Sequence, residues 1–109
     1  MSKPNQCNVY PHETCETICL PTNKKYITAK ISVAQDDDDK LFRFGLDFGT
    51  PTSGYGYGAY QFSQTFKTRE DAIRCGIKTI IDRTPGYEEL ISKSQYANLI
   101  AEEMQISLF

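Results

Sequence analysis

The chain has 109 residues, which suffices for one small domain and leaves no room for a second. Lys and Arg total 12 against 14 Asp and Glu, which gives a net charge of -2. Such a chain lacks the overall positive potential that drives non-specific binding to phosphates, so DNA binding would be indirect or weak, through a local patch or a tether. No apolar run approaches the roughly 20 residues needed to span a bilayer, and no signal peptide is visible. We expect a cytoplasmic protein that does not enter membranes.

Residues 1–23 combine Cys, Pro, Thr and Asn without a sustained hydrophobic period, which predicts an irregular N-terminal arm. Four potential zinc ligands lie within thirteen residues of this arm: Cys7, His12, Cys15 and Cys19. A tetrahedral site with three thiolates and one imidazole would suit structural zinc, although the arm has no Cys-x-x-Cys pair. The alternative is three reduced thiols and a surface histidine, since the cytosol keeps cysteines reduced.

Alternating apolar and polar residues predict antiparallel strands after the arm. One strand is expected over 27–33, a second over 42–48 and a third over 59–66. Their core faces are expected to carry Ile27, Ala29, Ile31 and Val33, then Phe42, Phe44, Leu46 and Phe48, then Tyr60, Phe62 and Phe66. The opposite faces would be exposed to solvent, as in an antiparallel sheet that is covered on one side. The four aspartates at 36–39 predict a solvated hairpin turn between the first two strands, because adjacent carboxylates repel one another.

A long helix is expected to begin after Thr68, a favourable N-cap residue, and to end at Thr84-Pro85-Gly86. Its apolar stripe is Ala72, Ile73, Gly76, Ile77, Ile80 and Ile81, with Cys75 as a small core residue. Further on, Tyr87, Leu90 and Ile91 share one face, whereas Tyr96, Leu99 and Ile100 fall on nearly the opposite face. This change of face predicts a break near Lys93-Ser94 and a second piece that leads away from the core.

The predicted fold class is therefore α+β. We expect an antiparallel meander of three or more strands packed against one long helix, with one or two further C-terminal helices. The single domain would span residues 24–104.

A glycine- and tyrosine-rich stretch, residues 54–60, precedes the third predicted strand. It has neither the helix nor the Lys that a phosphate-binding glycine loop requires. Tyr55, Tyr57 and Tyr60 on a mobile hairpin could stack on single-stranded bases, with Arg43 and Lys67 as nearby cations. The alternative is a wide hairpin loop whose glycines adopt positive φ.

Residues 105–109 contain the most specific motif, Gln105, Ile106, Ser107, Leu108 and Phe109. This pentapeptide resembles the clamp-binding peptide of bacterial replication and repair proteins: Gln, an aliphatic residue, Ser or Asp, then Leu-Phe. Ile106 replaces the commoner Leu. The resemblance implies a tail that docks into a hydrophobic groove of the bacterial DNA sliding clamp, with Leu108 and Phe109 as adjacent apolar anchors. It implies nothing about the fold of the remaining residues.

The sequence indicates no catalytic set. It has one histidine and no recognisable nucleophile motif, and its only dense group of carboxylates is the aspartate run at 36–39, which is expected to be exposed to solvent. We expect a non-enzymatic accessory protein without a cofactor, apart from zinc in the arm, that reaches replicating or repaired DNA through the clamp. A phage or plasmid origin would fit. Three alternatives stay open: a nucleic-acid-binding module, a terminal Leu-Phe that packs on the protein's own helices, and a homo-oligomer in which it caps a neighbouring subunit.

Overall fold

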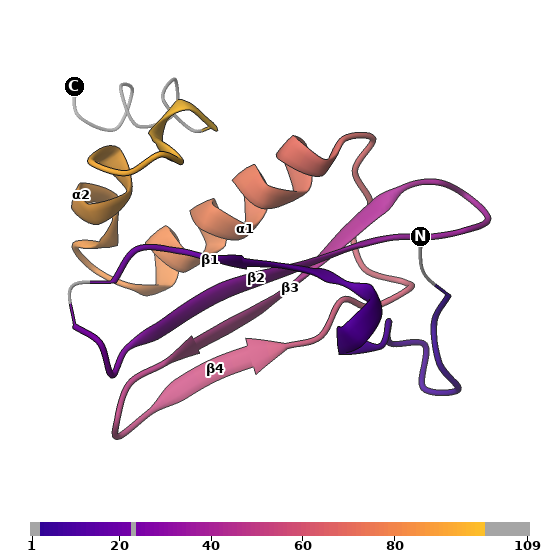
Figure 1. Ribbon diagram of the computed structural model, residues 1–109, viewed down its shortest axis with the longest axis horizontal. Coiled ribbons are helices and arrows are strands. Elements are labelled where there is room, and N and C mark those ends of the chain that lie inside the picture. The colour runs from indigo at the N-terminus through magenta and orange to yellow at the C-terminus, as the bar shows by residue number, and fades with distance from the viewer. Residues whose placement is uncertain (1–2, 23, 100–109) are drawn as a thin grey trace.

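The strands form one antiparallel sheet in chain order. The computed structural model describes residues 3–22 and 24–99. Within them the sheet has the order β1-β2-β3-β4, so each strand pairs with its neighbours in sequence. The predicted meander is confirmed (Figure 1). Its strands are β1 Glu16–Cys19, β2 Thr28–Gln35, β3 Phe42–Gly49 and β4 Gly54–Tyr57.

Helix α1, Arg69–Arg83, lies across one face of this sheet (Figure 1). It begins where predicted, because the Oγ1 atom of Thr68 accepts a hydrogen bond from the Asp71 amide at 3.1 Å. The predicted apolar stripe faces the sheet, with Ile81 partly buried at its margin. The core between helix and sheet is built mainly from Ile31, Val33, Leu46, Phe48, Ala72, Ile73, Ile77 and Ile80. Phe42 and Phe44, which we also placed on this face, pack against it while only partly buried.

The described chain ends in helix α2, Tyr87–Ser92, and the short 3-10 helix η2, Ala97–Leu99. The helix ends at Ser92 with Lys93 as its C-cap, close to the predicted break. The expectation that the next piece leads away from the core is wrong for the residues described. Tyr96 and Leu99 pack against the core, and the Tyr96 hydroxyl donates to the Cys19 carbonyl at 3.3 Å. Ile100 lies outside the described residues.

The third predicted strand was misplaced. The strand that pairs with β3 is β4 at 54–57, whereas residues 59–66 form only isolated bridges, Val9 with Tyr60 and Phe42 with Phe66. A Cβ added at Gly45 would lie 2.5 Å from the Tyr57 carbonyl oxygen and 2.7 Å from the Ala59 nitrogen. The chain therefore leaves the ladder by crossing closely over Gly45. Phe62, assigned to the core from the pattern, is 68% exposed.

The N-terminal segment is more regular than predicted. Strand β1 lies inside the segment expected to be irregular and pairs with β2 from Glu16–Val33 to Cys19–Lys30. Ile18 is buried in the main core because its side chain points to the α1 face. The strand is only four residues long. A strand this short leaves too few residues for its alternation to stand out in the sequence.

The face of the sheet opposite α1 is partly covered by other residues of the chain. This corrects the prediction that the whole face is exposed to solvent. Tyr10, Ala34 and Ala59 form a second buried cluster there, with Cys15 packed against it. Tyr10 is anchored by backbone hydrogen bonding of its amide to the Ala59 carbonyl at 3.0 Å. The N-terminal segment and the chain after β4 thus cover this face together.

A polar network completes that second cluster and changes the interpretation of the aspartate turn. Asp36 is buried and accepts hydrogen bonds from the Tyr10 hydroxyl at 2.6 Å and the Asp38 amide at 2.7 Å. Arg43, also buried, binds both carboxylate oxygens of Asp39, at 2.6 and 2.9 Å. The turn does connect β2 to β3, but its first and last aspartates are structural anchors and only part of it is solvated. A buried charge needs such partners to offset its desolvation.

The main core should be sensitive to truncation at its centre. Ile77 is fully buried between α1 and the sheet. We expect Ile77→Ala to lower the free energy of unfolding by about 2 to 5 kcal/mol, because it removes apolar contacts and leaves a cavity. Lys78→Ala, at the next and exposed position of α1, should change it by less than about 0.5 kcal/mol. Urea denaturation measures both, and equal losses would contradict the assignment of faces.

Acid should destabilise the protein through the second network. The Tyr10 hydroxyl lowers the pKa of Asp36, and the Arg43 guanidinium lowers the pKa of Asp39. A carboxyl whose pKa falls on folding stabilises the protein above its unfolded pKa, and this stabilisation is lost as the pH drops through the folded pKa. We therefore expect the urea midpoint to fall as the pH drops from about 4 to about 2.

Two variants in the same turn test whether Asp36 causes this acid sensitivity. Asp36→Asn should lower stability at neutral pH and flatten part of the pH profile, because one titrating carboxyl is gone while Asp39 remains. Asp38→Asn changes an exposed carboxyl two residues away and should keep the profile of the parent protein. If both variants keep that profile, Asp36 is not the source of the sensitivity.

Candidate functional site

The structure does not bring the four candidate zinc ligands together. Cys7 is exposed near the start of the chain, His12 is in the 3-10 helix η1 (His12–Thr14), and Cys19 is exposed in β1. The Cys15 thiol donates to the Pro11 carbonyl at 3.4 Å, and burial raises its pKa. Among residues 3–22 and 24–99, no three His, Cys, Asp or Glu side chains are placed to hold a metal ion. The structure therefore does not assemble a zinc site from these four side chains, and zinc binding by the arm stays a prediction.

The three tyrosines proposed to stack on bases occupy two different places. Tyr55 and Tyr57 pair with Phe48 and Leu46 in the β3–β4 ladder, so their side chains point to the α1 face. The Tyr55 ring stacks on Phe48 with centroids 5.5 Å apart. Tyr60 instead packs edge-on against Phe62, 5.6 Å away, beyond the end of β4. The stretch is an edge strand, which corrects the hairpin-loop interpretation.

The cation expected beside these tyrosines is engaged elsewhere. Arg43 is bound to Asp39 and also donates to the Gln61 carbonyl at 3.1 Å. It lies over the Tyr10 ring and not over Tyr55 or Tyr57. Lys67 is exposed before α1. The proposed stacking surface is therefore not assembled from these residues, although Tyr57 and Tyr60 are each exposed.

The clamp-binding-like peptide, residues 105–109, lies outside the described residues. The geometry that follows concerns the folded domain alone.

A groove that the sequence did not indicate lies where the α1–α2 turn meets the end of the sheet. Its walls come from the segment before β2, the end of β3, the turn at residues 84–86 and helix α2. Gly86 has a φ of 86° and directly precedes α2, so this turn requires a residue that adopts the left-handed region readily. After this turn, Tyr87 at the start of α2 packs against Phe48 near the end of β3, and both line the groove.

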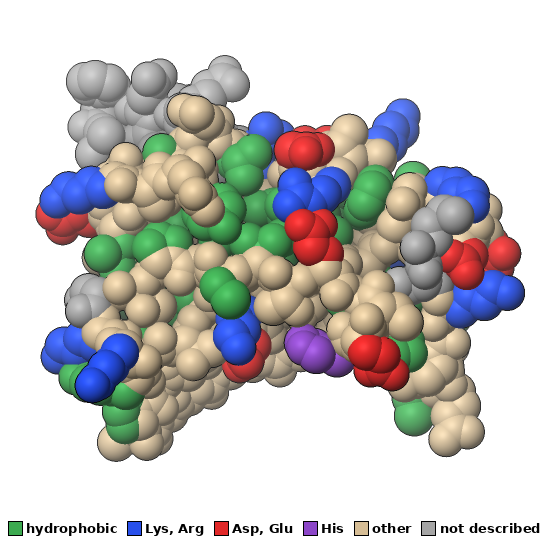
Figure 2. Space-filling view, in the orientation of Figure 1, with side chains coloured by type: hydrophobic (Ala, Val, Ile, Leu, Met, Phe, Trp, Pro, Cys, Tyr) green, Lys and Arg blue, Asp and Glu red, His purple; other side chains and the backbone are tan. Residues whose placement is uncertain are grey.

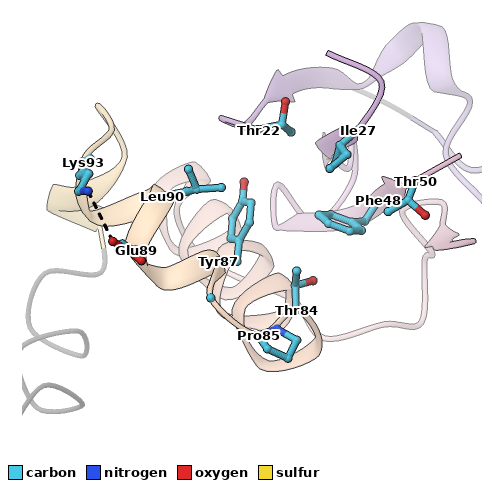
Figure 3. Close-up of a pocket in the computed structure, with 11 residues that line it drawn as sticks. Thr22, Ile27, Phe48, Thr50, Thr84, Pro85, Tyr87, Glu89, Leu90 and Lys93 are labelled. Carbon is cyan, nitrogen blue, oxygen red and sulfur yellow. Dashed lines mark ion pairs between the residues drawn. The ribbon is translucent and has the colours of Figure 1, made fainter. Parts of the chain in front are cut away.

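The groove has a volume of about 450 Å³, within the range of small-molecule pockets. Phe48 and Tyr87 meet edge to face in it with ring centroids 6.2 Å apart. Figure 3 shows Tyr87 and Leu90 on one side, Phe48 and Ile27 on the other, and Thr84 and Pro85 near the turn. Thr22 and Thr50 add hydroxyl groups to a lining that is otherwise mainly apolar.

A smaller hollow of about 240 Å³ adjoins this groove. The two share Phe48, Thr50, Thr84 and Pro85, so they form one continuous depression. Tyr55 and Arg83 line the smaller part, and the Arg83 guanidinium lies 4.9 Å from the centre of the Tyr55 ring. The Tyr55 hydroxyl is buried without a hydrogen-bond partner, the one such side-chain atom among the described residues.

The polar groups around the depression differ in their availability. Lys93 pairs with Glu89 at 3.6 Å on the exposed side of α2 (Figure 3). The Tyr87 hydroxyl is satisfied, since it donates to the Pro21 carbonyl at 2.9 Å, and burial raises the pKa of Tyr87. Arg83 has no ion pair within the part of the chain that the structure describes. The smaller hollow is therefore lined by Arg83, whose charge is unpaired among the described residues, and by Tyr55, whose buried hydroxyl has no partner there.

A second, shallower depression lies on the β1 side of the molecule. Figure 2 shows a band of hydrophobic side chains between the helices and β1 on this face. A hollow of about 310 Å³ is lined there by Leu20, Pro21, Tyr96 and their neighbours. Elsewhere on β1, Glu16 forms an exposed ion pair with Arg69 of α1 at 2.5 Å. The lining of the hollow carries no unpartnered buried polar atom, so it offers less to a specific ligand.

Comparisons with protein-family models, with curated proteins and with solved structures found no match. No described helix has the length and apolar character needed to cross a membrane.

Two tyrosines of the groove give a paired test of the unpartnered hydroxyl. Tyr55→Phe should raise the free energy of unfolding by about 1 kcal/mol, because it removes a buried hydroxyl that makes no hydrogen bond. Tyr87→Phe should lower it by about 1 kcal/mol, because it leaves the Pro21 carbonyl without its donor. Urea denaturation compares them, and a Tyr55→Phe loss as large as that of Tyr87→Phe would show that the Tyr55 hydroxyl is bonded.

Proposed function

We propose that this protein binds the bacterial DNA sliding clamp through Gln105, Ile106, Ser107, Leu108 and Phe109. The observation that carries the proposal is the match of this pentapeptide to the clamp-binding pattern of replication and repair proteins. Clamp binding would bring the domain to replicating or repaired DNA in the bacterial cytoplasm. The protein acts as a non-enzymatic accessory factor, and a phage or plasmid gene is a fitting source.

The physical chemistry of the peptide supports this proposal. Leu108 and Phe109 are adjacent large apolar side chains, the kind of anchor that dominates the affinity of short peptides. The Gln105 amide can donate and accept hydrogen bonds at a pocket rim, which adds specificity. A five-residue peptide that is ordered on binding is expected to reach micromolar affinity, on the order of 8 kcal/mol.

The folded domain is compatible with a tail that serves a partner. Within the described residues, the two helices pack against the sheet in one core. Ile91 of α2 is fully buried in it. Five residues, 100–104, separate Leu99 from the pentapeptide in the sequence. At about 3.3 to 3.6 Å per residue, an extended segment of that length would span roughly 17 to 18 Å. That reach would allow the motif to enter a partner's groove while the domain stays outside it.

The nucleic-acid-binding alternative receives less support. The net charge is -2, Arg43 is held by Asp39, and the three tyrosines do not share one surface. Non-specific binding to single strands requires a positive groove beside stacked aromatics. Direct DNA contact is therefore not part of the proposal.

The clamp hypothesis predicts a sharp loss on removing the two anchors. Leu108→Ala with Phe109→Ala should abolish binding to a purified bacterial sliding clamp, measured by surface plasmon resonance. The thermal midpoint of the domain should stay within a few degrees of the parent, because the proposal assigns both anchors to the partner's groove and not to the core of the domain. Binding of the parent should change little with salt, since its anchors are apolar.

A matched control removes two exposed aromatics elsewhere. Tyr60→Ala with Phe62→Ala deletes a comparable apolar area from the domain surface and should leave clamp binding unchanged. Persistent binding of the Leu108 and Phe109 double variant would show that the motif is coincidental. A fall of many degrees in its midpoint would show that the tail packs on its own domain.

A further inference from the structure

The depression at the α1–α2 turn combines an apolar body with one polar end. Its larger part is lined by Ile27, Phe48, Tyr87 and Leu90. Its smaller part is lined by Tyr55 and Arg83, and the shared residues Phe48 and Pro85 join the two. A ligand that fills both parts must therefore be apolar over most of its length and polar at one end.

The polar end is suited to an anion. Arg83 is exposed in the last turn of α1 and forms no ion pair among the described residues, so its charge is available. Its guanidinium is held over the Tyr55 ring, which limits the freedom it must lose when it binds a ligand. A planar guanidinium matches the two oxygens of a carboxylate.

The Tyr55 hydroxyl is the second independent observation. It is buried and lacks an acceptor, and Tyr55 lines the same hollow as Arg83. Nearly all buried polar groups in proteins find a partner, so this hydroxyl is a candidate donor to a ligand that enters the hollow. A ligand oxygen that accepts from this hydroxyl would remove the cost of leaving it unpaired.

We propose that the groove and the adjoining hollow form one site for a small carboxylate with an apolar ring or short acyl body. The carboxylate binds Arg83 and accepts from the Tyr55 hydroxyl, while the body packs between Phe48 and the α2 residues Tyr87 and Leu90. A phosphate ester fits less well, because its greater charge calls for several donors and the hollow offers one free cation. This site is separate from the pentapeptide, so it stands whether or not the protein binds a clamp.

The experiment is a titration of the full chain with matched probes. 2-Naphthoate supplies ring and carboxylate, and 2-naphthylmethanol supplies the same ring without charge. Amide shifts in two-dimensional ¹H–¹⁵N NMR spectra report the position of binding. We expect saturable shifts centred on Thr50, Thr84 and Gly86, with a dissociation constant for 2-naphthoate of about 0.1 to 1 mM, as expected of a small fragment. The alcohol should bind about tenfold more weakly.

Two variants test the assigned contacts. Arg83→Gln should weaken 2-naphthoate roughly tenfold and leave the alcohol unchanged, because only the charged partner is lost. Lys78→Gln removes an exposed cation from the same helix that does not line the depression, and should change neither. Tyr55→Phe should also weaken 2-naphthoate, although it is expected to stabilise the free protein. Spectral dispersion verifies that each variant is folded.

Each outcome of these titrations either supports or overturns the proposed site. Binding of 2-naphthoate that depends on Arg83 and Tyr55, with shifts at the groove, supports the site. Equal affinity for acid and alcohol, an unchanged affinity in Arg83→Gln, or saturable shifts centred elsewhere would overturn it. Absence of saturable binding by either probe would overturn it as well.

Discussion

The packing of α1 against β2 and β3 is the contact on which the rest of the structure depends. Gly76 lets the helix approach the sheet closely, since an added Cβ would lie 2.8 Å from Ile31 Cδ1. On either side of it Ile73, Ile77 and Ile80 are buried against the strands. This contact fixes the direction of α1, and therefore the place where the chain turns into α2. The groove exists because that turn lies at the end of β3 instead of over its middle.

The other face of the sheet is closed by a different kind of interaction. Here the apolar residues are few, and the cluster of Tyr10, Ala34 and Ala59 is completed by buried carboxylate, phenol and guanidinium groups. Such a network stabilises only when every charge has its partners, so it specifies how the N-terminal segment must lie. The sheet is thus covered on both sides, by a helix on one and by irregular chain on the other.

The two proposals for this protein use separate parts of it. Clamp binding rests on a short peptide whose affinity would come from its own side chains and needs nothing from the domain. The carboxylate site rests on the domain alone and joins residues of β3, β4, α1 and α2. A domain that senses a small acid and a tail that locates it at DNA would be physically independent modules. Independent modules can be tested one at a time, because a variant in either leaves the other intact.

Local pattern determined much of this protein. The pattern of neighbouring residues was enough to predict the alternation in β2 and β3, the Thr68 cap, the apolar stripe of α1 and the break at Lys93. Burial on one face of a strand or helix imposes a regular period on its apolar residues. Tertiary structure alone decided the rest. The crossing over Gly45 displaced the third strand, Tyr10 turned Asp36 from a solvated residue into a buried one, and β1 formed within the segment expected to be irregular. The depression around Phe48, Tyr55 and Arg83 brings together side chains distant in sequence, and no local period records such a meeting.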